Sequence, residues 1–184
     1  MNFLDIIQLR SCILQTIRSF FYSQGFLELD APALVPAPGQ EPYLEPFNTV
    51  LRDHAGSERN AYLITSPEYA CKKALAQGVK KIFSLQHVYR NNESLGGLHQ
   101  PEFMMLEWYR AGASYLEIMD DVEALVAAVG SGLACPPGRR VPDHGGAQGP
   151  TLRWHKIRVV DAFARLANMD EATLLAGSSS ERYE

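Results

Sequence analysis

The stretch HVYRNNESLGGLHQPEFMMLEWYR, residues 87–110, decides the fold. An apolar run leads into Arg90, a polar turn containing glycine follows over residues 91–97, and a second strand-like run covers residues 102–109. Two such runs joined by a turn predict a long antiparallel hairpin. Side chains alternate across a strand, so Phe103, Glu107 and Tyr109 are expected on one face. With a fixed cation nearby, that face could hold a charged ligand.

The segments before the hairpin show alternating helix and strand patterns. Apolar residues at helical spacing predict a helix over residues 4–24, and a short strand follows at 26–30. Prolines at 32, 36 and 38 are expected to prevent regular structure there. Residues 44–53 and 61–65 resemble two strands around an exposed polar tip.

A second helix and further elements flank the hairpin. Ser66 is a plausible N-cap, with Pro67 at the first helical position and a stop at Gly78. Ser114 begins another helix, with Glu117 at the capping-box position. The remaining predictions are a strand at 80–89, an irregular loop rich in proline and glycine at 135–150, a strand near 152–157, and helices near 158–168 and 170–176.

Composition excludes several classes of protein. With 184 residues, 46% apolar and 21% charged, the chain is that of an ordinary globular domain, and its net charge of −4 gives no general basic field for nucleic acid. Isolated cysteines, no signal peptide and no membrane-length apolar run predict a cytoplasmic protein. Hairpins interleaved with helices predict an α+β fold with a mainly antiparallel sheet and helices packed on it.

The ends of the hairpin strands offer a phosphate-binding chemistry. The guanidinium of Arg90 could bind a phosphate through two charge-assisted hydrogen bonds, although a surface ion pair is the commoner role of an arginine. Phe103 could stack on a base, although core packing is its ordinary role. Both alternatives stay open on these residues alone.

A second candidate site begins at Ser66, Pro67 and Glu68. A helix start offers free N–H groups, a hydroxyl and a carboxylate, and helix capping alone would explain all three. The functional alternative is a pocket in which Glu68 and Glu107 neutralise a substrate ammonium group. Glu107 lies on the same strand face as the aromatics, where a half-buried carboxylate needs a cation or hydrogen-bond donors.

These residues carry a resemblance to a known family. The segments YRNNE, HQPEF and MLEWYR resemble motif 2 of the class II aminoacyl-tRNA synthetases, about residues 87–110 here, and RSFFYSQGFLELDAP resembles motif 1, about 17–32. The resemblance implies the antiparallel sheet flanked by helices of that family's catalytic domain. In the family, motif 1 builds a dimer interface, so the resemblance also implies a homodimer.

A finer similarity points to the lysyl branch. PAPGQEPYLEPF, ITSPEYACKKALAQG and HQPEFMMLEWYR resemble a subgroup of that branch that ligates (R)-β-lysine to a lysine of translation elongation factor P. Motif 1 lies close to the first residue, so no anticodon-binding domain is expected and tRNA is an unlikely substrate. The resemblance implies lysine or (R)-β-lysine as substrate, elongation factor P as protein partner, and ATP with Mg²⁺.

The resemblance also implies roles for individual positions. The reaction would form an aminoacyl adenylate at the α-phosphate of ATP, with Arg90 as the catalytic residue, followed by transfer to an amine. No metal ligand is assigned. The ATP-binding positions are Arg90, Asn91, Asn92, Glu93, Gln100 and Phe103. The substrate-binding positions are Ser66, Pro67, Glu68, Glu107 and Tyr109.

The sequence departs from the family pattern in three places. Asn92 separates Asn91 from Glu93, which leaves open which of Asn92 and Glu93 lies near adenine, and Gln100 replaces the usual asparagine. Motif 3, with its ATP-binding arginine, is not found, so residues 1–184 are expected to be a partial, C-terminally incomplete catalytic domain that is inactive alone. The alternatives are the catalytic core of a lysyl-tRNA synthetase and an inactive synthetase-like fragment for binding or dimerisation.

Overall fold

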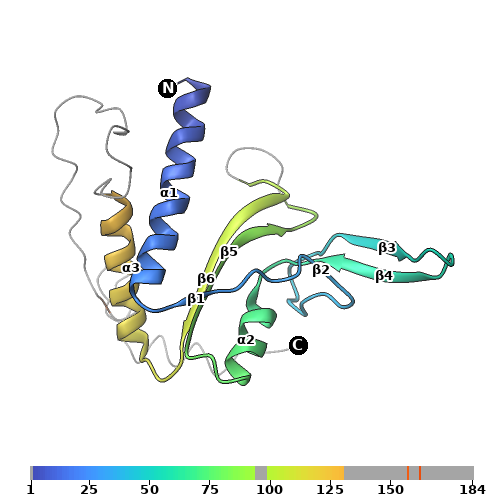
Figure 1. Ribbon diagram of the computed structural model, residues 1–184. Helices are drawn as coiled ribbons and strands as arrows, with labels where there is room; N and C mark the ends of the chain where they lie inside the picture. Colours follow the sequence, from blue (N-terminus) through green and yellow to red (C-terminus); the bar gives the residue numbers. More distant parts are fainter. Residues whose placement is uncertain (1, 94–98, 131–156, 158–161, 163–184) are drawn as a thin grey trace. The chain divides into compact units, whose positions relative to one another are not determined.

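A computed structural model describes residues 2–93, 99–130, 157 and 162. Contacts divide the chain into two units, residues 1–146 and 147–184, and all the elements named below lie in the first. The loop predicted at 135–150, the strand near 152–157 and the helices near 158–168 and 170–176 lie outside the described residues, except for positions 157 and 162. The elements are α1 (Phe3–Ser23), β1 (Leu27–Glu28), β2 (Leu34–Val35), β3 (Asn48–Arg52), β4 (Glu58–Leu63), α2 (Glu68–Ala76), β5 (Lys81–Tyr89), β6 (Glu102–Arg110) and α3 (Tyr115–Gly130) (Figure 1).

Helix α1 confirms the helix predicted over residues 4–24, and its start is defined by a reciprocal cap. The Asn2 side chain accepts from the backbone N–H of Asp5 at 2.9 Å, and the Asp5 carboxylate accepts from the backbone N–H of Asn2 at 2.9 Å. Two otherwise unpaired donors of the first turn are satisfied in this way. The helix ends before Gly25, whose φ of +77° suits a residue without a side chain.

The predicted hairpin is confirmed as β5 and β6. The two strands pair antiparallel along their whole length, from Lys81 opposite Arg110 to Tyr89 opposite Glu102. Strand β1 adds to the outer side of β5 in the parallel direction, with Leu27 opposite Ile82. The sheet has the order β1–β5–β6, so it is mainly antiparallel with one parallel pair.

The core lies where α1 and α3 cover one face of this sheet (Figure 1). Phe21 of α1 is fully buried and stacks on Phe83 of β5, with 4.7 Å between ring centres. Leu125 of α3 completes the cluster, whereas Leu116 of the same helix is exposed. The even-numbered side chains of β6 pack against this cluster: Met104, Leu106 and Trp108.

The strands predicted at 44–53 and 61–65 form a second sheet, of order β2–β4–β3. The turn between β3 and β4 is shorter than predicted, because β4 begins at Glu58. Asp53 closes this turn by accepting from the backbone N–H groups of Ala55 and Ser57 at 2.8 and 2.9 Å. The ladder continues almost to the tip, where Arg52 lies opposite Glu58.

The expectation that prolines exclude regular structure was wrong over two residues. Leu34 and Val35 form strand β2 and pair with Leu63 and Tyr62 of β4. A proline removes only its own N–H group, and β2 lies at the edge of its sheet, so flanking prolines leave a short strand possible. The fold is α+β, as predicted, with two three-stranded sheets instead of one.

Candidate active site

Arg90 and Phe103 come together at the open end of the hairpin. Arg90 follows β5 directly, and its backbone N–H donates to the carbonyl of Pro101 at 2.9 Å. Its guanidinium lies over the ring of Phe103, 5.3 Å from the ring centre, and its Nε donates to the carbonyl of Thr65 at 3.4 Å. No ion pair to Arg90 occurs among the described residues. In the described part of the chain, its contacts are with the Phe103 ring and with the carbonyls of Thr65 and Pro101.

The other residues predicted to contact ATP lie around the hairpin loop. Some of them contact other groups of the protein and others are exposed. Asn91 is tied to Glu45: its backbone N–H donates to the Glu45 carbonyl at 2.8 Å and its Nδ2 donates to the Glu45 carboxylate at 3.1 Å. Asn92 is exposed and has a φ of +55°, which an asparagine tolerates better than most residues. Glu93 lies 3.7 Å from Nδ1 of His99. Gln100 is exposed and precedes β6.

The start of α2 differs by one residue from the prediction. Pro67, and not Ser66, occupies the N-cap position, so Glu68 is the first helical residue. The Ser66 hydroxyl still accepts from the backbone N–H of Glu68 at 3.3 Å. The difference arises because Pro67 has ψ near 2°, outside the helical range, while its carbonyl accepts the first helical hydrogen bond from Cys71 at 3.0 Å. Pro67 is fully buried beneath this turn.

Glu107 and Tyr109 point away from the core, as the strand alternation predicted. The Tyr109 hydroxyl donates to the Glu107 carboxylate, and both side chains are partly buried. Burial raises the pKa of the Glu107 carboxyl, and the hydrogen bond from Tyr109 lowers it in part. Burial, followed by the hydrogen bond to Glu107, raises the pKa of Tyr109 above its ordinary value. The tyrosine hydroxyl therefore remains a hydrogen-bond donor.

The surroundings of Glu107 are acidic. Glu68 and Glu41 both raise the pKa of Glu107, whereas Lys72 lowers it. Lys72 forms an ion pair with Glu68 one helical turn away. Sequence reasoning missed Lys72, although its i,i+4 spacing from Glu68 was a readable signal. It also missed Glu41, for which the irregular proline-containing segment offered no pattern.

The buried thiol of Cys71 lies beneath this acidic region. Its side chain is fully buried, and burial together with the charge of Glu107 raises its pKa to about 11. A thiol with such a pKa stays protonated at neutral pH and is a poor nucleophile. Cys71 therefore packs under the site and does not supply chemistry.

The candidate residues on β6 form a row along one strand face. Successive residues of a strand advance about 3.3 Å, so Phe103 and Glu107 lie about 13 Å apart along the sheet. Arg90 lies at the Phe103 end, and Glu68 lies near Glu107. The row therefore has an aromatic and cationic end and an acidic end on one face of the strand.

One end of the row combines the guanidinium of Arg90 with the ring of Phe103. A guanidinium beside an aromatic ring matches the phosphate and base of a nucleotide. In the described part of the chain, no group of three or more histidine, cysteine, aspartate or glutamate residues could hold a metal ion. Mg²⁺ that arrives with nucleotide phosphates needs only one or two protein carboxylates. Glu93 and Glu102 at the hairpin end would be the groups available for it.

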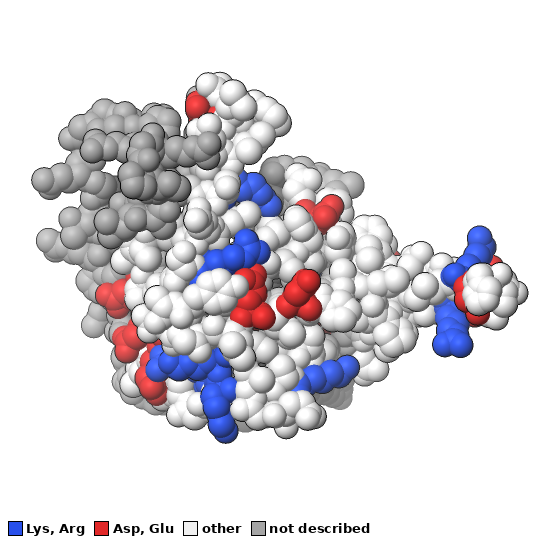
Figure 2. Space-filling view, in the orientation of Figure 1, with Lys and Arg blue, Asp and Glu red and all other residues white. Residues whose placement is uncertain are grey.

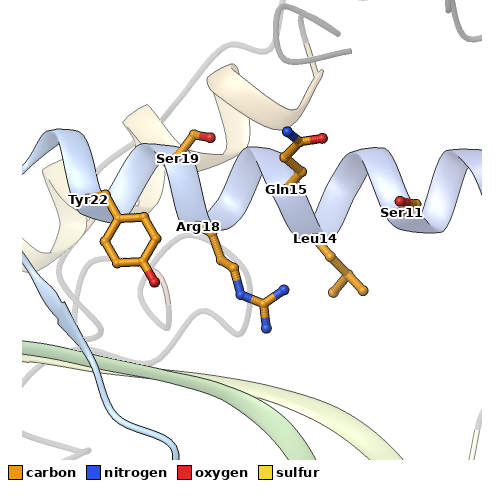
Figure 3. A pocket seen from close by; sticks show the side chains of 6 residues that line it. All are labelled: Ser11, Leu14, Gln15, Arg18, Ser19 and Tyr22. Atoms are coloured by element: carbon orange, nitrogen blue, oxygen red, sulfur yellow. The ribbon is translucent and has the colours of Figure 1, made fainter. Parts of the chain in front are cut away.

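The segment predicted as motif 1 presents a polar surface on α1. The Arg18 Nε donates to the Glu28 carboxylate at 2.8 Å, and the Tyr22 hydroxyl donates to the other oxygen of the same carboxylate. These contacts fix the helix end against β1. Figure 3 shows the neighbouring side chains along this side of α1, which line a shallow pocket: Ser11, Leu14, Gln15, Arg18, Ser19 and Tyr22. Dimerisation through this segment stays a prediction.

Charges of both signs are interspersed on the surface. Figure 2 shows acidic and basic side chains close together on the face in view and at the tip of the projecting β3–β4 hairpin, where Arg52 pairs with Glu58 at 2.6 Å. No helix in the described ranges combines the length and the apolar character needed to cross a bilayer.

Comparison with known proteins gives the chain a family. The family model for tRNA synthetases class II (D, K and N) matches residues 2–180. Proteins named elongation factor P–(R)-β-lysine ligase are similar in sequence: that of Haemophilus ducreyi is 41% identical over 129 residues, which is 70% of this chain and 38% of the relative. The protein of that name from Pseudoalteromonas translucida is 42% identical over 122 residues, 65% of this chain and 37% of the relative.

The chain spans less than two fifths of the length of these relatives. The family assignment does not depend on that share, because the family model covers nearly all of the sequence. The chain belongs to the family of class II tRNA synthetases of the D, K and N type.

Proposed function

We propose that the natural protein is an ATP-dependent aminoacyl ligase that activates lysine or (R)-β-lysine and transfers it to a lysine of translation elongation factor P. The observation that carries this proposal is the row on β6, with Arg90 over Phe103 at one end and Glu107 beside Glu68 at the other. The names of the similar proteins support the choice of substrate and partner.

The acidic end supports a substrate with two ammonium groups. Glu41 and Glu68 both act on Glu107, and Lys72 is the cation that pairs with Glu68. Three carboxylates and one ammonium leave two negative charges uncompensated when all are ionised. Lysine and (R)-β-lysine each carry two ammonium groups, which suits an acidic region of this kind. Tyr109, which donates to Glu107, would keep that carboxylate oriented toward the substrate.

In the proposed first step, the substrate carboxylate attacks the α-phosphate of ATP and pyrophosphate leaves. Arg90 would stabilise the negative charge that develops on the phosphate oxygens, and Phe103 would hold the base. ATP supplies the leaving group, so the protein needs no nucleophile of its own. In the second step, the ε-amine of a protein lysine attacks the activated carbonyl, AMP leaves, and a proton is released from the amine.

Amino-acid-dependent exchange of pyrophosphate into ATP tests the first step. In the natural protein, Arg90→Ala should lower the exchange rate by at least about 100-fold, because a preorganised charge at the reacting phosphate is lost. Arg59→Ala, on the exposed β4 strand, is the matched control and should exchange at the unaltered rate. Circular dichroism should show the same fold in both variants. An Arg90→Ala variant that exchanges normally would contradict the phosphate assignment.

Acceptor assays test the second step. The natural protein should label elongation factor P with radioactive lysine or (R)-β-lysine and leave tRNA uncharged. Efficient charging of lysine tRNA would instead identify the catalytic core of a lysyl-tRNA synthetase. Parallel assays with the two amino acids would also show which one is preferred.

A further inference from the structure

Lys72 forms an ion pair with Glu68, one of the carboxylates proposed to bind the substrate. The Lys72 ammonium donates to Oε1 of Glu68 in an i,i+4 ion pair across one turn of α2. The side chain of Lys72 is 56% exposed and that of Glu68 is 32% exposed, so the pair lies at the rim of the site and not in its floor.

The same ammonium also interacts electrostatically with Glu107. Glu68, followed by Tyr69 and Glu107, raises the pKa of Lys72, so its cationic form is favoured here. In return, Lys72 lowers the pKa of Glu107. Lys72 therefore acts as a resident cation in the same electrostatic region as Glu41, Glu68 and Glu107.

We propose that Lys72 is a specificity-determining residue that competes with the substrate ammonium group for Glu68. This inference rests on the proposed function, because it assumes that Glu68 and Glu107 receive a diamino acid. A substrate ammonium reaching Glu68 must displace the Lys72 ammonium or share the carboxylate with it. A ligand without a second ammonium group would leave the Lys72–Glu68 pair in place. It would gain no binding energy from Glu68.

Displacing Lys72 is easy because the pair is weak. Exposed i,i+4 ion pairs are worth only a few tenths of a kcal/mol, which corresponds to about a twofold cost in affinity. The positive charge of Lys72 remains near the pocket after displacement and repels the incoming cation. Removing the charge should therefore improve the binding of lysine by about three- to tenfold at low salt.

A positioning role for Lys72 would change KM for the amino acid in the opposite direction. If the lysine only held the Glu68 carboxylate in its binding orientation, loss of the lysine would let that carboxylate move and would weaken substrate binding. The direction of the change in KM therefore separates competition from positioning.

The experiment measures KM for lysine, for (R)-β-lysine and for ATP in pyrophosphate exchange by the natural protein. Lys72→Met, which keeps the chain length and removes the charge, should lower KM for the preferred amino acid about three- to tenfold and leave KM for ATP unchanged. Lys73→Met is the matched control, because Lys73 is an exposed neighbour on the same helix, and it should leave both KM values unchanged. Lys72→Arg restores the cation and should return KM to the wild-type value.

The outcomes separate this inference from the proposed function. Wild-type protein without amino-acid-dependent exchange would overturn the proposed function. Active wild-type protein with an unchanged or raised KM for the amino acid in Lys72→Met would overturn the competition and leave the proposed function intact. An equal fall in KM in Lys73→Met would show a general charge effect and would also overturn the inference.

Discussion

The guanidinium of Arg90 lies 5.3 Å from the centre of the Phe103 ring. The two residues are thirteen positions apart in sequence, and the antiparallel pairing of β5 with β6, which sets Val88 opposite Phe103, brings them together. A ring has two faces, so Phe103 can meet a cation on one and a purine on the other. The group proposed to bind the phosphate and the group proposed to bind the base therefore lie on one hairpin.

Phe103→Leu should raise KM for ATP about tenfold, because stacking on an aromatic side chain contributes about 1–3 kcal/mol per base. KM for the amino acid should stay unchanged, since the acidic end of the site is not altered. Tyr43→Leu provides a matched control at an aromatic residue that is 97% exposed. Steady-state exchange kinetics check both values, and an unchanged KM for ATP in Phe103→Leu would remove the stacking role.

Glu107→Gln should change stability in a way that depends on pH. Burial raises the pKa of the Glu107 carboxyl above that of an unfolded chain, so folding favours its protonated form. The stability contributed by that form is fully present below the unfolded pKa of about 4.3 and is lost as pH rises through the folded pKa. Relative to wild type, Glu107→Gln should therefore gain stability in urea titrations as pH rises above the unfolded pKa of about 4.3.

Glu117→Gln should show the opposite dependence. The backbone N–H of Ser114 donates to the Glu117 carboxylate at 2.8 Å, and this hydrogen bond lowers the pKa of that carboxyl. Its contribution is present above the unfolded pKa and is lost as pH falls through the folded pKa. Glu117→Gln should be less stable than wild type at neutral pH and equal to it in acid. If the stability of both variants relative to wild type changed with pH in the same direction, the directions assigned to the two pKa shifts would be contradicted.

Local pattern made most of the first sheet predictable. The β5–β6 hairpin and its side-chain alternation follow from one continuous stretch, and α1 and α3 follow from helical periodicity. The second sheet was harder, because β3 is exposed along its whole length and so lacks a burial pattern that would mark its ends. Strand β2 depends on pairing with a distant partner, which no local signal in its proline-rich segment reveals.

The candidate site was predictable where residues lie on one element and obscure where elements meet. The Glu107–Tyr109 contact follows from spacing along β6. The contact of Asn91 with Glu45 joins segments that are 46 residues apart, and only the tertiary fold reveals it. The influence of Glu41 on Glu107 likewise depends on where a loop without regular structure passes.

Phe21→Ala should lower the free energy of unfolding by about 3–5 kcal/mol, because it leaves a cavity in a fully packed site. Phe21 is completely buried and contacts the rings of Phe20, Phe26, Phe83 and Trp108. Phe3→Ala is the control, since Phe3 is 75% exposed on the same helix, and it should change stability by less than about 0.5 kcal/mol. Urea unfolding followed by tryptophan fluorescence measures both. Similar losses in the two variants would place the core elsewhere.

The side-chain amide of Gln86 joins the exit of the motif 1 segment to the hairpin. Its Oε1 accepts from the backbone N–H of Ala31 at 2.8 Å and from the hydroxyl of Ser84 at 3.0 Å, and Ser84 is fully buried. Gln86→Leu would leave both donors without this acceptor, at a cost of about 1–3 kcal/mol in stability. Its Nε2 has no partner among the described residues, so losing that group partly offsets the cost.

A double-mutant cycle separates the two hydrogen bonds of Gln86. Ser84→Ala removes one donor and leaves the Ala31 bond, so it should cost about 1 kcal/mol. In the Ser84→Ala background, Gln86→Leu leaves only the Ala31 N–H group without its acceptor. The loss of stability in the double variant should therefore be smaller than the sum of the single losses by about 0.5–1 kcal/mol. Urea unfolding of the four proteins measures the coupling. Strict additivity would mean that Ser84 and Gln86 do not share the bond, and the link between β5 and the motif 1 segment would then rest on Ala31 alone.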